Sequence, residues 1–234
     1  SGSGNSSSRL NDIFLVKYNS SGTKQWTKQL GTSDWEYGWG ITTDSSGNIY
    51  VTGSTTGVFD GNTNLGEDDL FLIKFNSSGT KIWTKQLGTS KGEEGFEVTI
   101  DSSDNIYVTG VTYGGLDGNT NSGLSDIFLV KYNSSGTKQW TKQLGSSSND
   151  VVLGLTTDST GHIYMTGTTE GGLDGNANSG GISCYIRASC KDIFLIKFNS
   201  SGTKDSTTST DNSTTTGLFV TVGDSGTILT SSDG

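Results

Sequence analysis

A fifteen-residue stretch from Asp126 to Trp140, DIFLVKYNSSGTKQW, recurs almost unchanged and constrains the fold more than any other feature of the chain. Its other copies begin at Asp12, Asp69 and Asp192. The first three copies are 57 residues apart, and the fourth follows after 66 because nine extra residues precede it. A fixed period of this length is typical of solenoids and propellers, in which one repeat cannot bury its apolar face alone.

The repeated stretch itself predicts a strand hairpin. Residues 127–132 are β-branched, aromatic or leucine apart from a lysine, which favours a strand buried on both faces. Residues 133–136, Asn-Ser-Ser-Gly, supply the side-chain hydrogen bonding and the glycine of a tight turn. Residues 137–144 then form a second strand, whose lysines are typical of an outer edge that avoids pairing with other chains.

Each period also contains a second hairpin, so one unit has four strands. Its first strand is glycine-rich, and its turn is Asp-Ser-Ser-Gly at residues 44–47. Asp104 stands where the other units have glycine, and aspartate tolerates the left-handed conformation better than most residues do. We expect the glycine-rich strands to line the axis of the fold and the repeated tryptophans to pack between sheets at the rim. The glycine-rich strands are 37–43, 94–100 and 151–157, and the tryptophans are Trp26, Trp83 and Trp140.

These units predict an all-β protein, a β-propeller of four-stranded antiparallel blades in one domain, residues 1–234. Residues 205–216 are a degenerate, Ser/Thr-rich strand, yet Asp224 follows Asp158 by 66 residues and keeps the tail in register. The first hairpin supplies the third and fourth strands of a unit, and the tail supplies the first and second. We therefore expect four blades, closed by N- and C-terminal strands that share one blade. The alternative is half of a larger seven- or eight-bladed ring.

The motifs DIFLVKYNSSGTKQWTKQLG and TTDSSGNIYVTG resemble the bacterial beta-propeller repeat family known as SBBP, over about residues 10–204. The resemblance implies a propeller in a secreted or cell-surface bacterial protein, and it implies no catalytic residues. The tail VGDSGTILTSSDG resembles the BNR-like or photosystem-stability-factor-like propeller repeat.

Charge limits the classes of partner. The formal net charge is −9, so nucleic acids and anionic lipid surfaces would be repelled at long range. We expect no nucleic-acid binding and, because the sequence has no long apolar run, no membrane insertion. Self-association stays open.

A polar loop between the second and third strands of each unit is interpreted as a simple turn, with a calcium site as the alternative. Oxygen-bearing residues at its first, third and fifth positions resemble the start of a calcium loop, although the glycine falls at position seven and no glutamate stands at position twelve. Asp-Gly and Asn-rich segments also form turns without metal. The candidate ligands are Asp60, Asn62, Asn64, Asp117, Asn119, Asn121, Asp174, Asn176 and Asn178.

The insertion at residues 181–191 is the one place where something new interrupts the repeat. Cys184 and Cys190 predict a disulfide, which would place the protein outside a reducing cytoplasm. Tyr185, Arg187 and Lys191 are residue types suited to recognition, so the insertion is a candidate binding loop. A drifted loop without a function is the alternative.

The sequence offers little for catalysis, because it has no catalytic triad, cysteine–histidine pair or histidine cluster. Glu97 on a predicted axial strand is the one carboxylate that could act as an acid or base, and His162 is interpreted as a turn residue. We expect a non-enzymatic, extracellular or surface-displayed bacterial scaffold that binds protein or glycan partners. The alternatives are a hydrolase or lyase acting at an axial channel, and a calcium-stabilised adhesin-like module.

Overall fold

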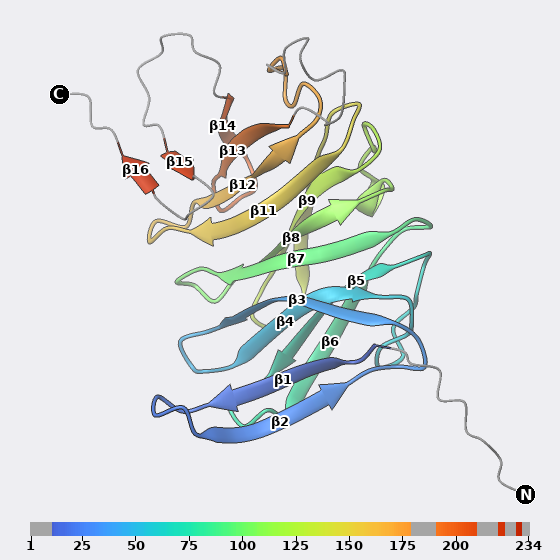
Figure 1. Ribbon diagram of the computed structural model, residues 1–234, viewed down its shortest axis with the longest axis vertical. Coiled ribbons are helices and arrows are strands. Elements are labelled where there is room, and N and C mark those ends of the chain that lie inside the picture. The colour runs from blue at the N-terminus through green and yellow to red at the C-terminus, as the bar shows by residue number, and fades with distance from the viewer. Residues whose placement is uncertain (1–10, 179–190, 210–219, 223–227, 231–234) are drawn as a thin grey trace, which may run out of the picture.

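The computed structural model describes residues 11–178, 191–209, 220–222 and 228–230 (Figure 1). It consists of antiparallel β-sheets stacked side by side along the long axis of the molecule. No helix in the described part of the chain has the length and apolarity needed to cross a membrane.

Three of the sheets have four strands each, and we name them blades 1, 2 and 3 in chain order. Within each blade the strands pair in sequence order. Blade 1 contains β3 (Glu36–Thr43), β4 (Ile49–Thr55), β5 (Asp69–Phe75) and β6 (Lys81–Leu87). Blade 2 contains β7 (Glu93–Ile100), β8 (Ile106–Thr112), β9 (Asp126–Tyr132) and β10 (Lys138–Leu144), with a short 3₁₀ turn, η1 (Leu116–Gly118), in its longest loop. Blade 3 contains β11 (Asp150–Thr157), β12 (Ile163–Thr169), β13 (Asp192–Phe198) and β14 (Lys204–Ser209).

Two further strand pairs stand at the ends of this row. They are β1 (Ile13–Tyr18) with β2 (Lys24–Leu30), and β15 (Val220–Val222) with β16 (Ile228–Thr230). The sequence predicts that these pairs complete one shared blade. In the structure each is a separate two-stranded sheet, and they lie at opposite ends of the row (Figure 1). The predicted four-stranded blades are therefore confirmed, whereas closure through a shared blade is not seen.

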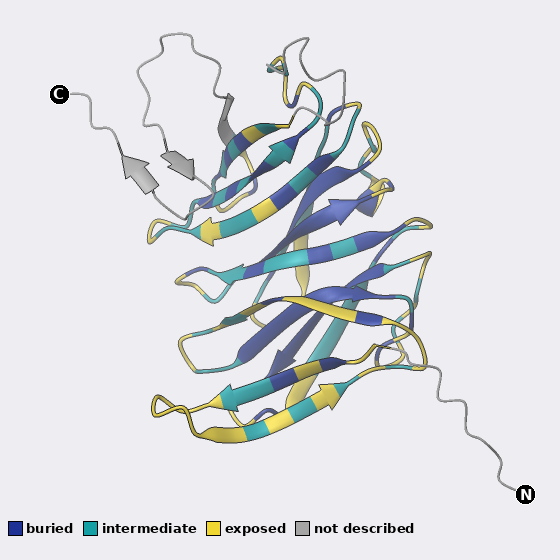
Figure 2. Cartoon of the chain, viewed as in Figure 1, coloured by how far each residue is buried: buried dark blue, intermediate teal, exposed yellow. Residues whose placement is uncertain are grey.

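The core lies between the blades and follows their two central strands. Every residue of β4, β5 and β8 is buried, and so are all residues of β9 except Lys131 (Figure 2). This agrees with the predicted strand that is buried on both faces, because each of these strands has another sheet on either side. The equivalent strand β1, at the end of the row, alternates between buried and exposed residues.

The glycine-rich strands β3, β7 and β11 pack against one another from blade to blade, as expected for the inner strand of a propeller. All three strands have a β-bulge at the same place. The bulge is seen as a shift in the pairing register between Gly38 and Gly40 and at the equivalent positions of the other two strands. Bulges of this kind re-aim a side chain. The residues at the bulges are Trp39, Phe96 and Leu153, and Trp39 meets Phe96 edge-on across the two blades.

A tryptophan of one sheet packs against a turn glycine of the next. A Cβ added to Gly136 would lie 3.0 Å from the ring of Trp83 and 2.8 Å from Cε of Lys85. Gly79 over Trp26 and Gly202 over Trp140 repeat this contact. The predicted position of the tryptophans, between sheets, is confirmed.

A lysine on the third strand adds a second link between neighbouring sheets. Lys17 Nζ donates to the carbonyl of Ser77 at 2.9 Å, and Lys131 Nζ donates to the carbonyl of Ser200 at 2.9 Å. Lys74 donates to Ser134 in the same way, at 3.3 Å. Lys74 Nζ also lies 3.9 Å from Oδ2 of Asp44, so this lysine has a carboxylate partner besides the turn carbonyl of the next sheet. The ammonium groups of Lys74, Lys131 and Lys197 also lie over the rings of Tyr50, Tyr107 and Tyr164.

The Asp-Ser-Ser-Gly turns are held by their first residue. Oδ1 of Asp101 accepts the backbone N–H groups of Ser103 and Asn105, and Oδ2 accepts the hydroxyl of Tyr107 at 2.9 Å. Burial opposes ionisation of Asp101, but the hydrogen bonds from Asn105 and Tyr107 outweigh it and lower the pKa of this carboxyl. Asp104 has φ +59°, so the prediction that it replaces a left-handed glycine is confirmed.

A paired substitution should measure the link between blades. Gly22 and Gly136 have the same backbone conformation, φ +78° and +79°, but only Gly136 has neighbours within 4 Å. We expect Gly22→Ala to cost about 1–2 kcal/mol from backbone strain alone. Gly136→Ala should cost roughly a further 2 kcal/mol from overpacking against Trp83. If urea denaturation showed the same loss of unfolding free energy in Gly22→Ala and Gly136→Ala, the packing role of this turn would be contradicted.

Candidate functional site

The two ends of the blades differ in chemistry. The hairpin turns at one end, on the left of Figure 1, have sequences such as Asn-Ser-Ser-Gly and Asp-Ser-Ser-Gly and contain no large apolar residue. We name the opposite end, which bears the longer loops, the loop face. Its described loops expose large apolar side chains with 41–63% of their surface accessible. These residues are Trp35, Val58, Leu65, Tyr113 and Leu124.

The candidate calcium residues lie on the loop face and form a tight turn. Asp60 and Gly61 both have positive φ, 51° and 74°, and the N–H of Asn62 donates to the carbonyl of Phe59 at 2.9 Å. Two consecutive left-handed residues are the signature of a type I′ turn, which favours Asp-Gly. Asp117 and Asp174 repeat this geometry at φ 53° and 60°.

The oxygens of these turns are already used within the protein. Asp60 accepts hydrogen bonds from Lys81 and Thr84, and Asp117 accepts them from Lys138 and Thr141. Asp174 pairs with Lys204. Burial opposes ionisation of Asp60, but Lys81 and Thr84 lower the pKa of its carboxyl.

The amides of the turns are used as well. Asn62, Asn119 and Asn176 each donate to the carbonyl three residues earlier, and Asn64 and Asn121 each accept a backbone N–H two residues later. Asn178 also has a partner. In the described residues no group of three or more His, Cys, Asp or Glu could hold a metal ion. The geometry fits the turn interpretation and does not fit a cation site, and calcium binding stays untested.

Most of the insertion lies outside the described residues, including Cys184, Cys190, Tyr185 and Arg187. The predicted disulfide and most of the predicted binding loop therefore have no structural description. Lys191 is described and exposed, and its Nζ lies 3.5 Å from Oε1 of Glu170.

An acidic and aromatic group lies on the loop face where blade 1 meets blade 2. Burial, followed by the charge of Asp68, raises the pKa of Glu94. Burial and then the charge of Glu67 raise the pKa of Asp68, and burial with the charges of Glu94 and Asp68 raises the pKa of Tyr113. We name Glu67, Asp68, Glu94 and Tyr113 the acidic junction, because the pKa values of Asp68, Glu94 and Tyr113 are each raised by a charge of another member. They give the loop face a negative region beside an exposed aromatic ring.

The acidic junction was missed at the sequence level, although the repeat contains a signal for it. Where blade 2 has Glu94, the other blades have Tyr37 and Val151. Asp68 and Tyr113 likewise differ from their counterparts one period away. In a chain of nearly identical repeats, residues that depart from the repeat are the ones that the fold does not require.

The buried acids near the junction have structural roles. Glu93 is fully buried and accepts hydrogen bonds from the N–H of Thr89 at 2.6 Å, its hydroxyl at 2.8 Å and the hydroxyl of Thr112 at 2.7 Å. Burial raises the pKa of Glu93 although these bonds oppose it. Glu36 makes the equivalent contacts with Thr32 and Thr55, so these acids fasten the loop before each inner strand.

Glu97 and His162 occupy the positions that the sequence indicated. Glu97 lies half-buried on β7, opposite Thr109 on β8, and burial raises the pKa of its carboxyl. His162 follows the turn of Asp158, and its Nδ1 lies 2.7 Å from Oγ1 of Thr160 and 3.1 Å from Oδ2 of Asp158. The turn interpretation of His162 agrees with this geometry.

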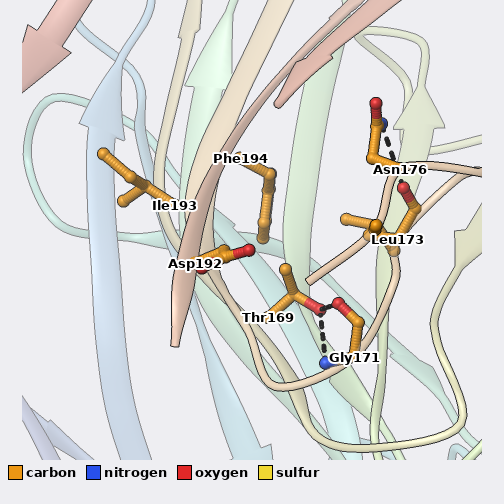
Figure 3. A pocket seen from close by; sticks show the side chains of 8 residues that line it. Thr169, Gly171, Leu173, Asn176, Asp192, Ile193 and Phe194 are labelled. Carbon is orange, nitrogen blue, oxygen red and sulfur yellow. Dashed lines mark hydrogen bonds between the residues drawn. The ribbon is translucent and has the colours of Figure 1, made fainter. Parts of the chain in front are cut away.

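A small pocket of about 10 Å³, enough for roughly one water molecule, lies in blade 3 (Figure 3). Leu173, Asn176, Asp192 and Phe194 line it, and Thr169 exchanges hydrogen bonds with Gly171 at its rim.

A glutamine fills the equivalent place in the other two blades. In blade 2, Gln143 donates to the carbonyl of Gly114 at 3.0 Å and to Oδ2 of Asp126 at 2.9 Å, and it accepts the N–H of Leu116 at 2.9 Å. Gln143 pairs with Phe128, and in blade 3 the residue that pairs with the equivalent phenylalanine is Ser209. The pocket in Figure 3 is therefore the place of an amide that blade 3 lacks.

Comparison with known proteins agrees with this repeat architecture. The beta-propeller repeat family SBBP matches residues 25–60, 82–117 and 139–174. Each match runs from the tryptophan-bearing outer strand, through the inner strand of the following blade, to its Asp-Gly turn. The chain is therefore a beta-propeller repeat protein, with three SBBP repeats. The matches do not extend to the tail, so its resemblance to BNR-like repeats is not shown.

Two curated proteins are similar to this chain at low identity. The regulatory protein FlaEY of Caulobacter vibrioides is 27% identical over 167 residues, which cover 64% of this chain and 18% of FlaEY. The uncharacterized WD repeat-containing protein L264 of Acanthamoeba polyphaga mimivirus is 27% identical over 172 residues, which cover 62% of this chain and 12% of L264. The aligned part therefore spans less than one fifth of either relative.

Replacing one acid of the junction should change how stability depends on pH. A carboxyl whose pKa is raised by folding keeps its proton to a higher pH in the native state than in the unfolded chain. The stability of the wild type should therefore fall as pH rises from 4.5, the ordinary value for Glu94, to the raised native value. Glu94→Gln removes this loss. The free energy of unfolding of the variant, measured by urea denaturation, should therefore rise relative to that of the wild type between pH 4 and 7. A constant difference across that range, or the same trend in the control Asp34→Asn on an exposed part of a different loop, would rule out the junction as the cause.

Restoring the missing amide should stabilise blade 3. Ser209→Gln supplies the side chain that bridges a carbonyl, a carboxylate and an N–H in the other blades, which is worth about 1 kcal/mol. Gln143→Ala should cost about 1–3 kcal/mol, because it leaves the same partners unsatisfied in blade 2. Thr208→Gln, one residue away on the opposite side of the strand, is the matched control. A thermal unfolding midpoint unchanged in Ser209→Gln would show that blade 3 does not reproduce the glutamine site.

Proposed function

We propose that the protein is a non-enzymatic binding scaffold whose loop face receives a protein or glycan partner. The observation that carries the proposal is the difference between the two ends of the blades. One end is a series of tight polar turns, whereas the other exposes aromatic and aliphatic side chains from several loops around an acidic junction. Exposed apolar groups rimmed by polar residues favour an interaction surface.

The chemistry of the junction indicates what the partner presents. Glu67, Asp68 and Glu94 favour ammonium and guanidinium groups, or hydroxyls that donate hydrogen bonds. Tyr113 supplies an amphipathic ring, a residue type that is enriched where binding energy concentrates. We therefore expect a basic segment of a protein, or the hydroxyl-rich face of a glycan, at this place.

Other parts of the proposal rest on analogy and on the sequence. A regulatory relative, FlaEY, supports a binding role, and it comes from a bacterium. We place the protein on the surface of a bacterial cell or outside it, because a disulfide between Cys184 and Cys190 would persist there. The proposed scaffold is a closed propeller. The described geometry does not specifically favour the hydrolase or lyase alternative at Glu97, or the calcium-stabilised adhesin.

Arrays of peptides and glycans would test the proposal with the wild type and three variants. The double variant Asp68→Asn/Glu94→Gln keeps the shape of the junction but removes two charges, and Asp34→Asn removes one charge from a different loop. We expect ligands selected by the wild type to bind the double variant at least tenfold more weakly and Asp34→Asn almost unchanged. A deletion of residues 182–190 separates the insertion from the junction.

Two results would contradict the scaffold. Retention of every ligand by the double variant and by the deletion would remove the loop face from recognition. Turnover of a bound glycan by the wild type that is lost in Glu97→Gln would show that the protein is an enzyme.

A further inference from the structure

Among the strands that the structure describes, β1 and β2 pair only with each other, whereas their equivalents belong to four-stranded blades. Phe14 is 76% exposed, whereas its counterparts Phe71, Phe128 and Phe194 are at most 3% exposed. Tyr18 is 58% exposed, and its counterparts Phe75, Tyr132 and Phe198 are also at most 3% exposed. The difference has a structural cause. In every complete blade a second strand pairs along the free edge of the third strand, and β1 pairs only with β2.

The inner strand of blade 1 is exposed on the same side. Trp39 and Ile41 of β3 are 56% and 58% exposed, whereas Val98, the counterpart of Ile41 in blade 2, is 5% exposed. Trp35, Tyr37 and Trp39 form an exposed aromatic row with ring centroids 6.5 and 6.2 Å apart. β1 and β3 together line a groove of about 360 Å³, which contains Phe14, Tyr37, Trp39 and Ile41.

The groove has the position that the first two strands of a blade would occupy. In blade 2, β8 pairs along the edge of β9, and β7 packs against β11, the inner strand of the following blade. The same relation applied to β1 requires a hairpin whose second strand pairs with β1 and whose first strand covers β3.

The pair β15–β16 is such a hairpin. Val222 pairs with Ile228 and Val220 with Thr230, as Thr157 pairs with Ile163 and Leu155 with Met165 in blade 3. Both hairpins have the same number of residues between their paired ends. β15–β16 is also a separate sheet, so it has edges open to pairing.

The position of the hairpin indicates whether it can pair with β1 of its own chain or with β1 of another copy. β15–β16 lies at the opposite end of the row of blades from β1 (Figure 1). We propose that the β15–β16 hairpin of a second copy of this chain occupies the groove beside β1, and that the exchange is reciprocal. Two copies related by a two-fold axis then form two identical junctions, as closed symmetry requires. The described strands of each copy form three complete blades and two halves, so the described strands of two copies would form a ring of eight blades.

The register of the complete blades fixes which residues meet. Ile163 pairs with Phe198 and Met165 with Ile196 in blade 3. Applied to the junction, this register places Ile228 opposite Tyr18 of the second copy and Thr230 opposite Val16. The dimer is independent of the proposed binding role of the loop face, because the groove does not include the acidic junction.

Cysteine cross-linking in the whole chain tests both the second copy and the register. The background carries Cys184→Ser and Cys190→Ser, and Val16→Cys and Thr230→Cys are introduced in separate chains that are refolded together. We expect a disulfide-linked dimer in the mixture under mild oxidation, and none when either variant is oxidised alone. Phe14→Cys mixed with Thr230→Cys, two residues out of register, should give at least tenfold less dimer.

Three outcomes would overturn the inference. One chain carrying both Val16→Cys and Thr230→Cys could form a link within a monomer, which would mean that the hairpin closes the ring of its own chain. The mixture could give no link in any register. The wild type could also remain monomeric by light scattering at 100 µM, a concentration chosen to favour association, which would exclude a stable dimer even if a variant failed to fold.

Discussion

No sheet of this protein can bury both of its faces alone, and the contact between neighbouring blades is the interaction on which the rest depends. That contact has three parts that recur from sheet to sheet. A tryptophan of one sheet lies beneath a turn glycine of the next, a lysine donates to a carbonyl of that same turn, and the central strands pack face to face. Gly79, Gly136 and Gly202 are left-handed, and a Cβ at any of them would crowd the ring of the neighbouring tryptophan. The Asn-Ser-Ser-Gly motif is therefore fixed by the neighbouring sheet as well as by its own turn.

The regular part of the fold could be predicted from the sequence because each feature is repeated. Strand periodicity, turn chemistry and the 57-residue interval agree in every unit, and the structure has four-stranded blades where they indicate them. The left-handed conformation of Asp104 could also be predicted, because it follows from local chemistry alone. The carbonyl partners of Lys17, Lys74 and Lys131 could not be foreseen. They lie on the next sheet, and no local pattern identifies a carbonyl as an acceptor.

The candidate site was harder to predict, and for a physical reason. Asp60, Asp117 and Asp174 drew attention because they repeat, yet repetition marks what every blade needs, and the structure shows an Asp-Gly turn fastened by lysine. Glu94 and Tyr113 break the repeat, and the fold gives them no internal role of that kind. Their interaction depends on two sheets being brought together, so only the three-dimensional arrangement shows that residues 68, 94 and 113 are neighbours.

The exposed residues at the ends of the row have the same cause as the buried ones in its middle, because a sheet needs a neighbour on each face to bury its apolar side chains. A two-stranded sheet is marginally stable at best in water, because it has too few neighbours to bury its apolar residues. β1 shows this directly, since Ile13 and Leu15 on the side facing blade 1 are buried while Phe14 on the other side is exposed. At the other end, Ser206 and Thr208 stand where the preceding blade has Trp140 and Lys142, so the last outer strand lacks the residues that would hold another turn glycine.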